Sequence, residues 1–136
     1  MKLRLAIILA GLAGVAGVMP IAAHHSFAGT YLEDAPPVTI EGTLMAFQVR
    51  NPHSFVAVDD AKLKDAEGKP VRWSIEWGAA GQLAQQGVKV GTLKVGDKVQ
   101  VTGSQGRDPE AHRLRMRIIK RPSDGWSWGT QGQTFN

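Results

Sequence analysis

The strongest structural signal in the chain is the alternation of apolar and polar residues over residues 71–77. The segment reads VRWSIEW, so an apolar side chain recurs at every second position. A period of two is typical of a β-strand with one buried face, whereas apolar positions in an amphipathic helix recur every three or four residues. The chain is therefore expected to fold around a sheet, with Trp73 and Trp77 packed on its inward face.

Four further segments have the pattern of β-strands. Residues 38–46 alternate between apolar and polar side chains, with Gly42 indicating a bulge or a sharp bend. A second strand is predicted from His53, after an Asn-Pro turn, and the polar residues 59–70 are predicted to form a hairpin loop. The last two predicted strands lie around residues 99–101 and 113–118.

One segment favours a helix, and its place in the order of strands points to a fold. Residues 78–87 read GAAGQLAQQG, in which Ala, Leu and Gln favour a helix that Gly87 would end. Three strands, a helix and two strands match the five-stranded oligonucleotide/oligosaccharide-binding (OB) barrel. We therefore predict an all-β fold with one short helix, a small five-stranded OB-like β-barrel. Strand count favours it over an open sandwich.

The first 23 residues have the composition of a secretion signal. Lys2 and Arg4 precede an apolar run from Leu5 to Val18, and the segment ends at the small residue Ala23. The alternative is a transmembrane anchor, which usually takes about 20 apolar residues, and this run is shorter. We expect cleavage after Ala23, a periplasmic or secreted location, and no stable membrane span afterwards.

Cleavage would leave enough chain for one domain. We predict an N-terminal arm at residues 24–37, the barrel domain at 38–122, and a flexible tail at 123–136 that is rich in Gly, Ser, Gln and Trp. The domain has no cysteine, so neither disulfides nor thiolate metal ligands are available. We expect a monomer.

The positive charge of the chain is a weak argument for a nucleic-acid partner. The net charge of +4 would fall to +2 on cleavage, because the leader holds two basic residues and no acidic ones. Arg113, Arg115 and Arg117 share one strand face, which we expect to be solvated and paired with Glu41 or Glu76. We therefore predict no nucleic-acid partner. No hydrolase constellation, phosphate-binding glycine loop or HExxH pair occurs, so an enzyme is not the leading expectation.

Cleavage after Ala23 would create a candidate metal ligand at the new N-terminus. His24 would then offer its α-amine and its ring nitrogen, whose ordinary pKa values are about 7.7–8.0 and about 6.5, so neither is costly to deprotonate near neutral pH. His53 would add a third nitrogen, and His25 is a reserve ligand. Three nitrogens suit copper, because the divalent ion prefers tetragonal nitrogen ligation. A cut after Ala22 would instead give Ala-His-His, a copper site that uses backbone amides and needs no His53.

Several motifs resemble those of one family of small exported bacterial proteins. They read HHSFA just past the leader, EGTL and NPHSFVAVD around the first turn, VRWSIEW, and LKVGDKVQVTG. That family is classed as a domain of unknown function, and the resemblance covers about residues 20–125. It implies that the motif at residues 24–27 and the motif at residues 51–53 belong together. It implies no activity.

Three functional hypotheses follow. The leading one is an exported barrel that binds copper through His24 and His53, with His25 nearby, as a carrier, buffer or sensor. The alternative is a binding module without a metal, whose barrel face and tail residues Trp126 and Trp128 hold a glycan, a peptide or an envelope protein. A copper oxygenase using the same three nitrogens is the third, but it needs an exposed substrate platform that the sequence does not show.

Overall fold

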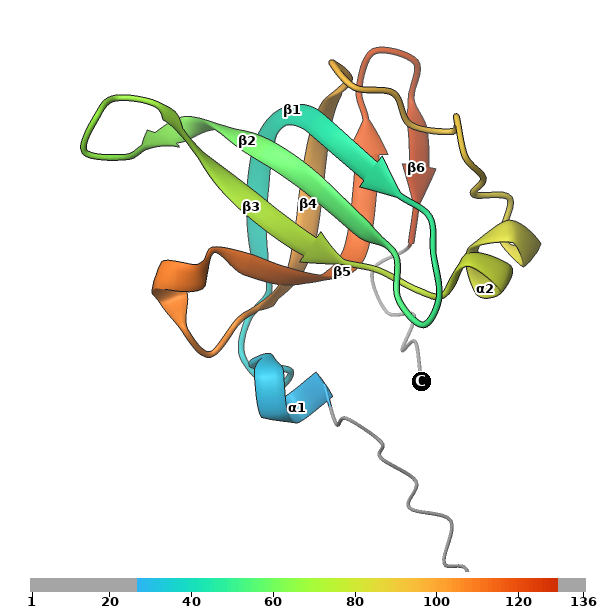
Figure 1. Ribbon diagram of the computed structural model, residues 1–136, viewed down its shortest axis with the longest axis horizontal. Coiled ribbons are helices and arrows are strands. Elements are labelled where there is room, and N and C mark those ends of the chain that lie inside the picture. The colour runs from blue at the N-terminus through green and yellow to red at the C-terminus, as the bar shows by residue number, and fades with distance from the viewer. Residues whose placement is uncertain (1–26, 130–136) are drawn as a thin grey trace, which may run out of the picture.

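A computed structural model describes residues 27–129, which form one small barrel with short helices outside it (Figure 1). The elements follow in the order α1 (Phe27–Thr30), β1 (Val38–Gln48), β2 (Phe55–Lys64), β3 (Pro70–Glu76), α2 (Ala80–Gln85), β4 (Lys98–Gln105), the 3₁₀ turn η1 (Pro109–Ala111), β5 (Arg113–Arg121) and β6 (Trp126–Trp128).

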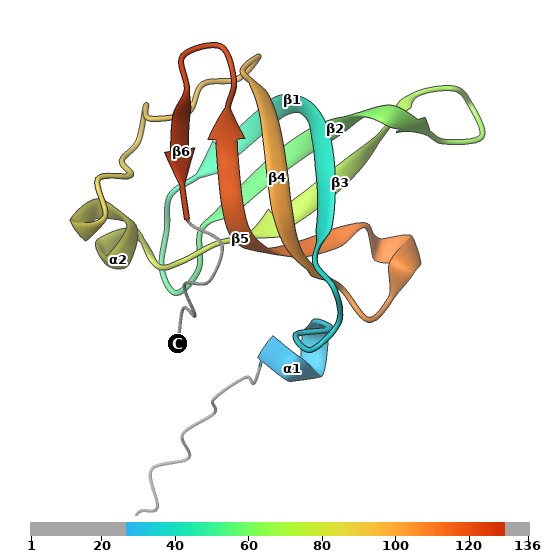
Figure 2. The ribbon, with the colours of Figure 1, turned by 180° about the vertical axis from the view of Figure 1, so that it is seen from behind.

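Five strands close into a barrel in the order β1-β2-β3-β5-β4. All neighbours are antiparallel except β3 and β5, which run parallel where residues 74–76 face residues 113–115. The front and rear views show β1 curving so that it belongs to both sides of the barrel (Figure 2). The helix α2 lies between the third and fourth strands, and the predicted OB-like barrel is confirmed.

Alternate side chains of the strands fill the barrel interior. Trp73 and Ile75 of β3 are buried, as is Trp77 just after it, so the prediction that both tryptophans pack inward is confirmed. Leu83 of α2 and Leu93 of the following loop join the same core cluster. Full burial of one such aliphatic side chain stabilises the fold by about 1.5–3 kcal/mol.

The first strand contains a bulge, at a different residue from the one expected. The register with β2 shifts between Leu44 and Ala46, so the bulge lies at Met45 rather than at Gly42. Past the bulge the alternation reverses, and Phe47 packs against the core. Gly42 serves another purpose, because a Cβ there would lie 2.1 Å from the carbonyl oxygen of Asp59.

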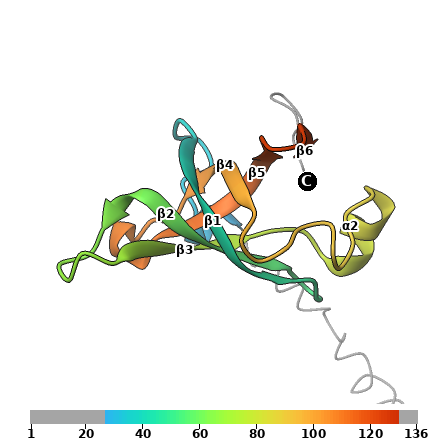
Figure 3. The same ribbon diagram turned by 90° about the horizontal axis from the view of Figure 1, so that it is seen from above.

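The loop of the β2–β3 hairpin is shorter than the predicted loop at residues 59–70. Both strands of the hairpin extend into it, and β2 ends only at Lys64. Asp60 is buried and accepts the backbone N–H groups of Lys62 and Leu63 and the indole N–H of Trp73. These three hydrogen bonds compensate for the burial of the Asp60 carboxylate, a polar group that its hydropathy alone would assign to an exposed loop. Seen from above, this hairpin and α2 project from opposite sides of the barrel (Figure 3).

The chain after β5 forms one more short strand. Residues 126–128, within the segment expected to be a flexible tail, form β6, an extra strand that pairs with the end of β5. Trp126 and Trp128 are half-buried against the core, and the indole N–H of Trp128 donates to Gln86. Apolar burial outweighed the Gly- and Ser-rich composition of the segment. Residues 130–136 lie outside the described residues.

Candidate functional site

The site begins with His53, which the end of the barrel holds in place. His53 precedes Ser54, whose backbone N–H donates to the carbonyl of Gly78 and whose carbonyl accepts from the N–H of Trp77. These bonds tie the segment before β2 to the end of β3. The side chain of His53 is 35% exposed, so part of the ring is accessible to solvent.

One ring nitrogen of His53 is engaged by a buried carboxylate. Nδ1 of His53 contacts Oε1 of Glu76, the last residue of β3. Glu76 is only 8% exposed, although the alternation of its strand places it on the outward face. It is buried because the N-terminal arm covers this end of the strand and Tyr31 lies against it.

Tyr31 completes a chain of three polar side chains. It is fully buried, and its hydroxyl donates to Oε2 of Glu76 at 2.5 Å. The guanidinium of Arg113 lies 3.7 Å from the same carboxylate oxygen. Burial and the hydrogen bond to the charged Glu76 together raise the pKa of the Tyr31 phenol well above its usual range. The phenol therefore stays protonated and remains a donor.

This arrangement assigns the tautomer of His53. An ionised carboxylate can only accept hydrogen bonds, so the proton of the neutral imidazole is placed on Nδ1. Nε2 then carries the free lone pair. Metal-binding histidines in proteins almost always have their other nitrogen bonded to a carboxylate, a carbonyl or water, which fixes the ring orientation. His53 and Glu76 form such a pair.

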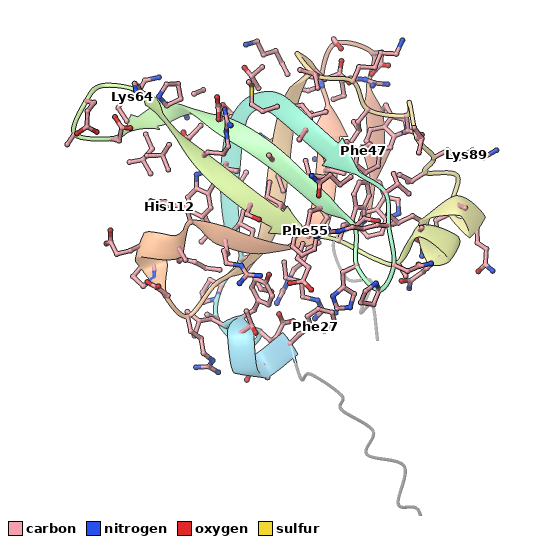
Figure 4. The ribbon with its side chains drawn as sticks, viewed as in Figure 1. Phe27, Phe47, Phe55, Lys64, Lys89 and His112 are labelled. Carbon is pink, nitrogen blue, oxygen red and sulfur yellow. The ribbon has the colours of Figure 1, made fainter. Side chains whose placement is uncertain are left out.

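The N-terminal arm lies against this pair. The ring of Phe27, the first described residue, is 5.2 Å from the ring of His53, and the guanidinium of Arg115 lies 3.8 Å from the Phe27 centroid. Tyr31 also bridges to Gly106 through the backbone. Figure 4 shows Phe27 on α1 pointing toward the end of the barrel near Phe55.

A second group of charges anchors the arm further along. Arg115 pairs with Glu33 at 2.6 Å, and the guanidinium of Arg117 donates to the Glu33 carbonyl and to the hydroxyl of Ser104. The arginine face of β5 was expected to be solvated and paired with Glu41 or Glu76. Of these three arginines, only Arg113 forms an ion pair with Glu76. Arg115 and Arg117 are bound by the N-terminal arm, which covers their face of β5. Sequence patterns cannot show this, because Glu33 and Arg115 are 82 positions apart.

The structure locates only part of the predicted site. His24 and His25 lie outside the described residues, as does the leader. Within residues 27–129, no group of three or more histidine, aspartate or glutamate side chains is arranged to hold a metal ion, and no helix is long and apolar enough to cross a membrane. The remaining described histidine, His112, follows η1 and packs edge-on against Trp73 of β3, at a centroid distance of 5.2 Å between the rings.

Sequence reasoning missed Tyr31 and Glu76 as site residues. The signal that could have suggested Glu76 is its position between two buried residues, Ile75 and Trp77, at the end of the most regular strand. For Tyr31 the only hint is that it lies seven residues after the first of two adjacent histidines.

Comparison with known proteins supplies a family and no activity. A family model described as "Family of unknown function (DUF6152)" matches residues 12–115. No curated protein matches the chain, and no solved structure does.

Proposed function

The chain belongs to the family of unknown function DUF6152, and we propose that it binds a metal ion, copper above others, through His24 and His53, with His25 nearby. A carrier, buffer or sensor role requires binding alone and suits a single small barrel. Export and cleavage after Ala23 are part of this proposal, because they create the terminal amine of His24.

The observation that carries the proposal is the contact between Phe27 and His53. Three peptide units span at most about 11 Å, so the Cα atom of His24 is limited to that distance from the Cα atom of Phe27. The Phe27 ring lies 5.2 Å from the His53 ring, so the described chain begins at the His53 end of the barrel, which supports the proposal. An arm that crossed any other part of the barrel would have excluded the proposal.

A second observation concerns the readiness of His53 to bind. Its Nε2 has the free lone pair, because Glu76 engages Nδ1 and holds the ring orientation. Tyr31 and Arg113 hold the carboxylate in turn. Such a preorganised ligand loses little conformational freedom when a metal binds.

Copper is favoured by the donors that the chain can offer. With no cysteine in the sequence, thiolate is unavailable, and the proposed donors are the amine and ring nitrogens of His24 and the ring nitrogen of His53. Three nitrogens in a T-shaped set suit the tetragonal preference of Cu(II), which also has the highest affinity in the divalent series.

The alternative of a metal-free binding module receives less support. Trp126 and Trp128, which would hold the partner, pack against the barrel core, and the cation of Arg121 lies 5.6 Å from the Trp126 ring. Packing in the folded barrel therefore accounts for much of the burial of these two tryptophans, without a bound partner.

The test is a Cu(II) titration of the protein beginning at His24, measured by calorimetry and by electron paramagnetic resonance. We expect His53→Ala to weaken binding at least tenfold and to remove one nitrogen from the resonance signal. His112→Ala is the matched control, because that histidine packs on Trp73 in another loop and should leave the affinity unchanged.

A third protein, extended by one alanine before His24, separates the terminal amine from the ring. We expect it to bind through a different nitrogen set with altered resonance parameters. Equal affinity for the His53→Ala and His112→Ala proteins would refute the role of His53, and identical spectra with and without the extra alanine would refute the role of the amine.

A further inference from the structure

The loop between α2 and β4 contains a short tandem repeat. Residues 88–97 read VKVGT followed by LKVGD. The first residue of each copy is buried, as Val88 and Leu93 are 2% and 3% exposed. The fourth residue is a glycine in the left-handed region, with φ of +89° at Gly91 and +96° at Gly96. The two copies, here called the tandem turns, therefore share a backbone design.

The same hydrogen bonds close both turns. The N–H of Lys89 donates to the hydroxyl of Thr92 at 2.9 Å, and the N–H of Lys94 donates to the carboxylate of Asp97 at 2.9 Å. In the reverse direction, the N–H groups of Thr92 and Asp97 donate to the carbonyls of Lys89 and Lys94, each at 3.0 Å. The last residue of each copy thus caps its own turn.

Further bonds fix the tandem turns to each other and to the barrel. One guanidinium nitrogen of Arg121 donates to the carbonyl of Thr92 and to the carboxylate of Asp97, both at 2.8 Å. The N–H of Gly96 donates to the carbonyl of Leu44 in β1, and the carbonyl of Asp97 accepts from Leu44. The loop is therefore a rigid platform, which reduces the entropy that binding would cost.

The side chains at the two tips have no part in this scaffold. Val90 and Val95 are 83% and 68% exposed, and they are two of the three exposed large apolar side chains among residues 27–129. Lys89 and Lys94, beside them, form no ion pair within that range. Asp97, the acidic residue within the tandem turns, is paired with Arg121. Each tip thus presents one apolar side chain beside one unneutralised cation.

We propose that the tandem turns are a docking surface for an anionic phospholipid bilayer. The lysines would meet lipid phosphates, and the valines would enter the interface, as apolar residues beside cations do in proteins that bind membrane surfaces. Two protruding tips suit a deformable layer better than a pre-shaped protein groove. The proposal is independent of metal binding, because none of the contacts described for His53, Glu76 and Tyr31 involves this loop.

The matched control lies at the other end of the molecule. Leu63 and Lys64, near the tip of the β2–β3 hairpin, also combine an exposed apolar side chain with a lysine. Figure 4 shows Lys89 and Lys64 at opposite ends. A protein that touches the bilayer through the tandem turns should tolerate changes at the hairpin.

The test is co-sedimentation with vesicles of phosphatidylcholine containing one quarter phosphatidylglycerol, using protein that begins at His24 because the apolar leader would itself bind lipid. Each lysine near an anionic surface strengthens binding about fivefold, so we expect K89Q/K94Q to weaken it about 25-fold. V90S/V95S should weaken it at least tenfold, and L63S/K64Q should not. All variants should keep the thermal unfolding midpoint of the parent protein.

Three results would overturn the proposal. The first is no binding of the parent protein to the anionic vesicles. The second is binding that pure phosphatidylcholine vesicles match. The third is binding that K89Q/K94Q weakens but V90S/V95S does not, with equal affinity for soluble polyglutamate, because that pattern indicates attraction to any polyanion, including an acidic protein.

Discussion

The buried hydrogen bond between Tyr31 and Glu76 gives the sharpest test of the site. Tyr31→Phe removes only the hydroxyl and keeps the ring that packs under the arm. The hydroxyl is fully buried and donates to a carboxylate oxygen at 2.5 Å, so no water can replace it without rearrangement. Hydrogen bonds to charged groups contribute about 1.5–3 kcal/mol.

The neighbouring Arg113 sets the expected size of the loss. Its guanidinium lies 3.7 Å from the same oxygen and its side chain is 39% exposed, so it can move closer and compensate in part. We therefore expect Tyr31→Phe to lower the free energy of unfolding by about 2 kcal/mol. For a domain of this size that corresponds to a fall of about 8 °C in the unfolding midpoint.

The assay is urea unfolding followed by tryptophan fluorescence, with the slope required to stay constant so that the midpoint reports stability. Glu76→Gln supplies the second arm of a double-mutant cycle. A neutral amide oxygen still accepts a weaker bond, so the coupling between the two changes should be about 1 kcal/mol. The reasoning fails if Tyr31→Phe costs less than about 0.5 kcal/mol, or the same in both backgrounds.

Three further expectations concern other parts of the barrel. Tyr31 is the only tyrosine, and its pKa is raised by burial and by Glu76, so alkaline absorbance titration should show no tyrosinate in the folded protein near its ordinary pKa of about 10. Stability should fall as the pH rises above about 10, where only the unfolded phenol ionises; a folded-state transition there would contradict this. Gly42→Ala should cost at least about 2 kcal/mol in urea unfolding, because its Cβ would lie 2.1 Å from the Asp59 carbonyl. Gly81→Ala, with open space in α2, should stabilise by about 0.5–1 kcal/mol, and similar losses at both positions would refute the contact argument. Burial raises the pKa of Asp60, but the bonds from Leu63, Lys62 and Trp73 outweigh it and hold that pKa below its usual range, so Asp60 stabilises the fold above about pH 4 and this contribution is lost as the pH falls. Asp60→Asn should therefore flatten the acid side of the stability profile, and an unchanged acid side would count against this role.

The strands were predictable because their information is local. A single buried face imposes a period of two on each strand, and VRWSIEW shows it without ambiguity. The position of α2 between the third and fourth strands then selected the OB-like order, which the pairing of β3 with β5 confirms. Errors arose where a strand departs from that period, as at the bulge after Leu44.

The candidate site was predictable only in its histidine. In the sequence, His53 was recognisable as a possible ligand because it follows an Asn-Pro turn. Glu76 has the pattern of a solvated residue and is buried because a distant segment covers it. The partner of Arg115 was likewise invisible, since an ion pair across 82 positions leaves no local signature.

The sequence alone determined which segments become strands, that thiolate ligands are absent, and that two histidine motifs exist. Only the tertiary structure decided that the ring of Phe27 packs against the ring of His53. It also decided that Glu76 contacts His53 and accepts a hydrogen bond from Tyr31, and that Arg121 links the two tandem turns. The reason is physical: periodicity reports each residue's own burial, whereas the closure of the barrel and the path of the arm determine which residues become neighbours.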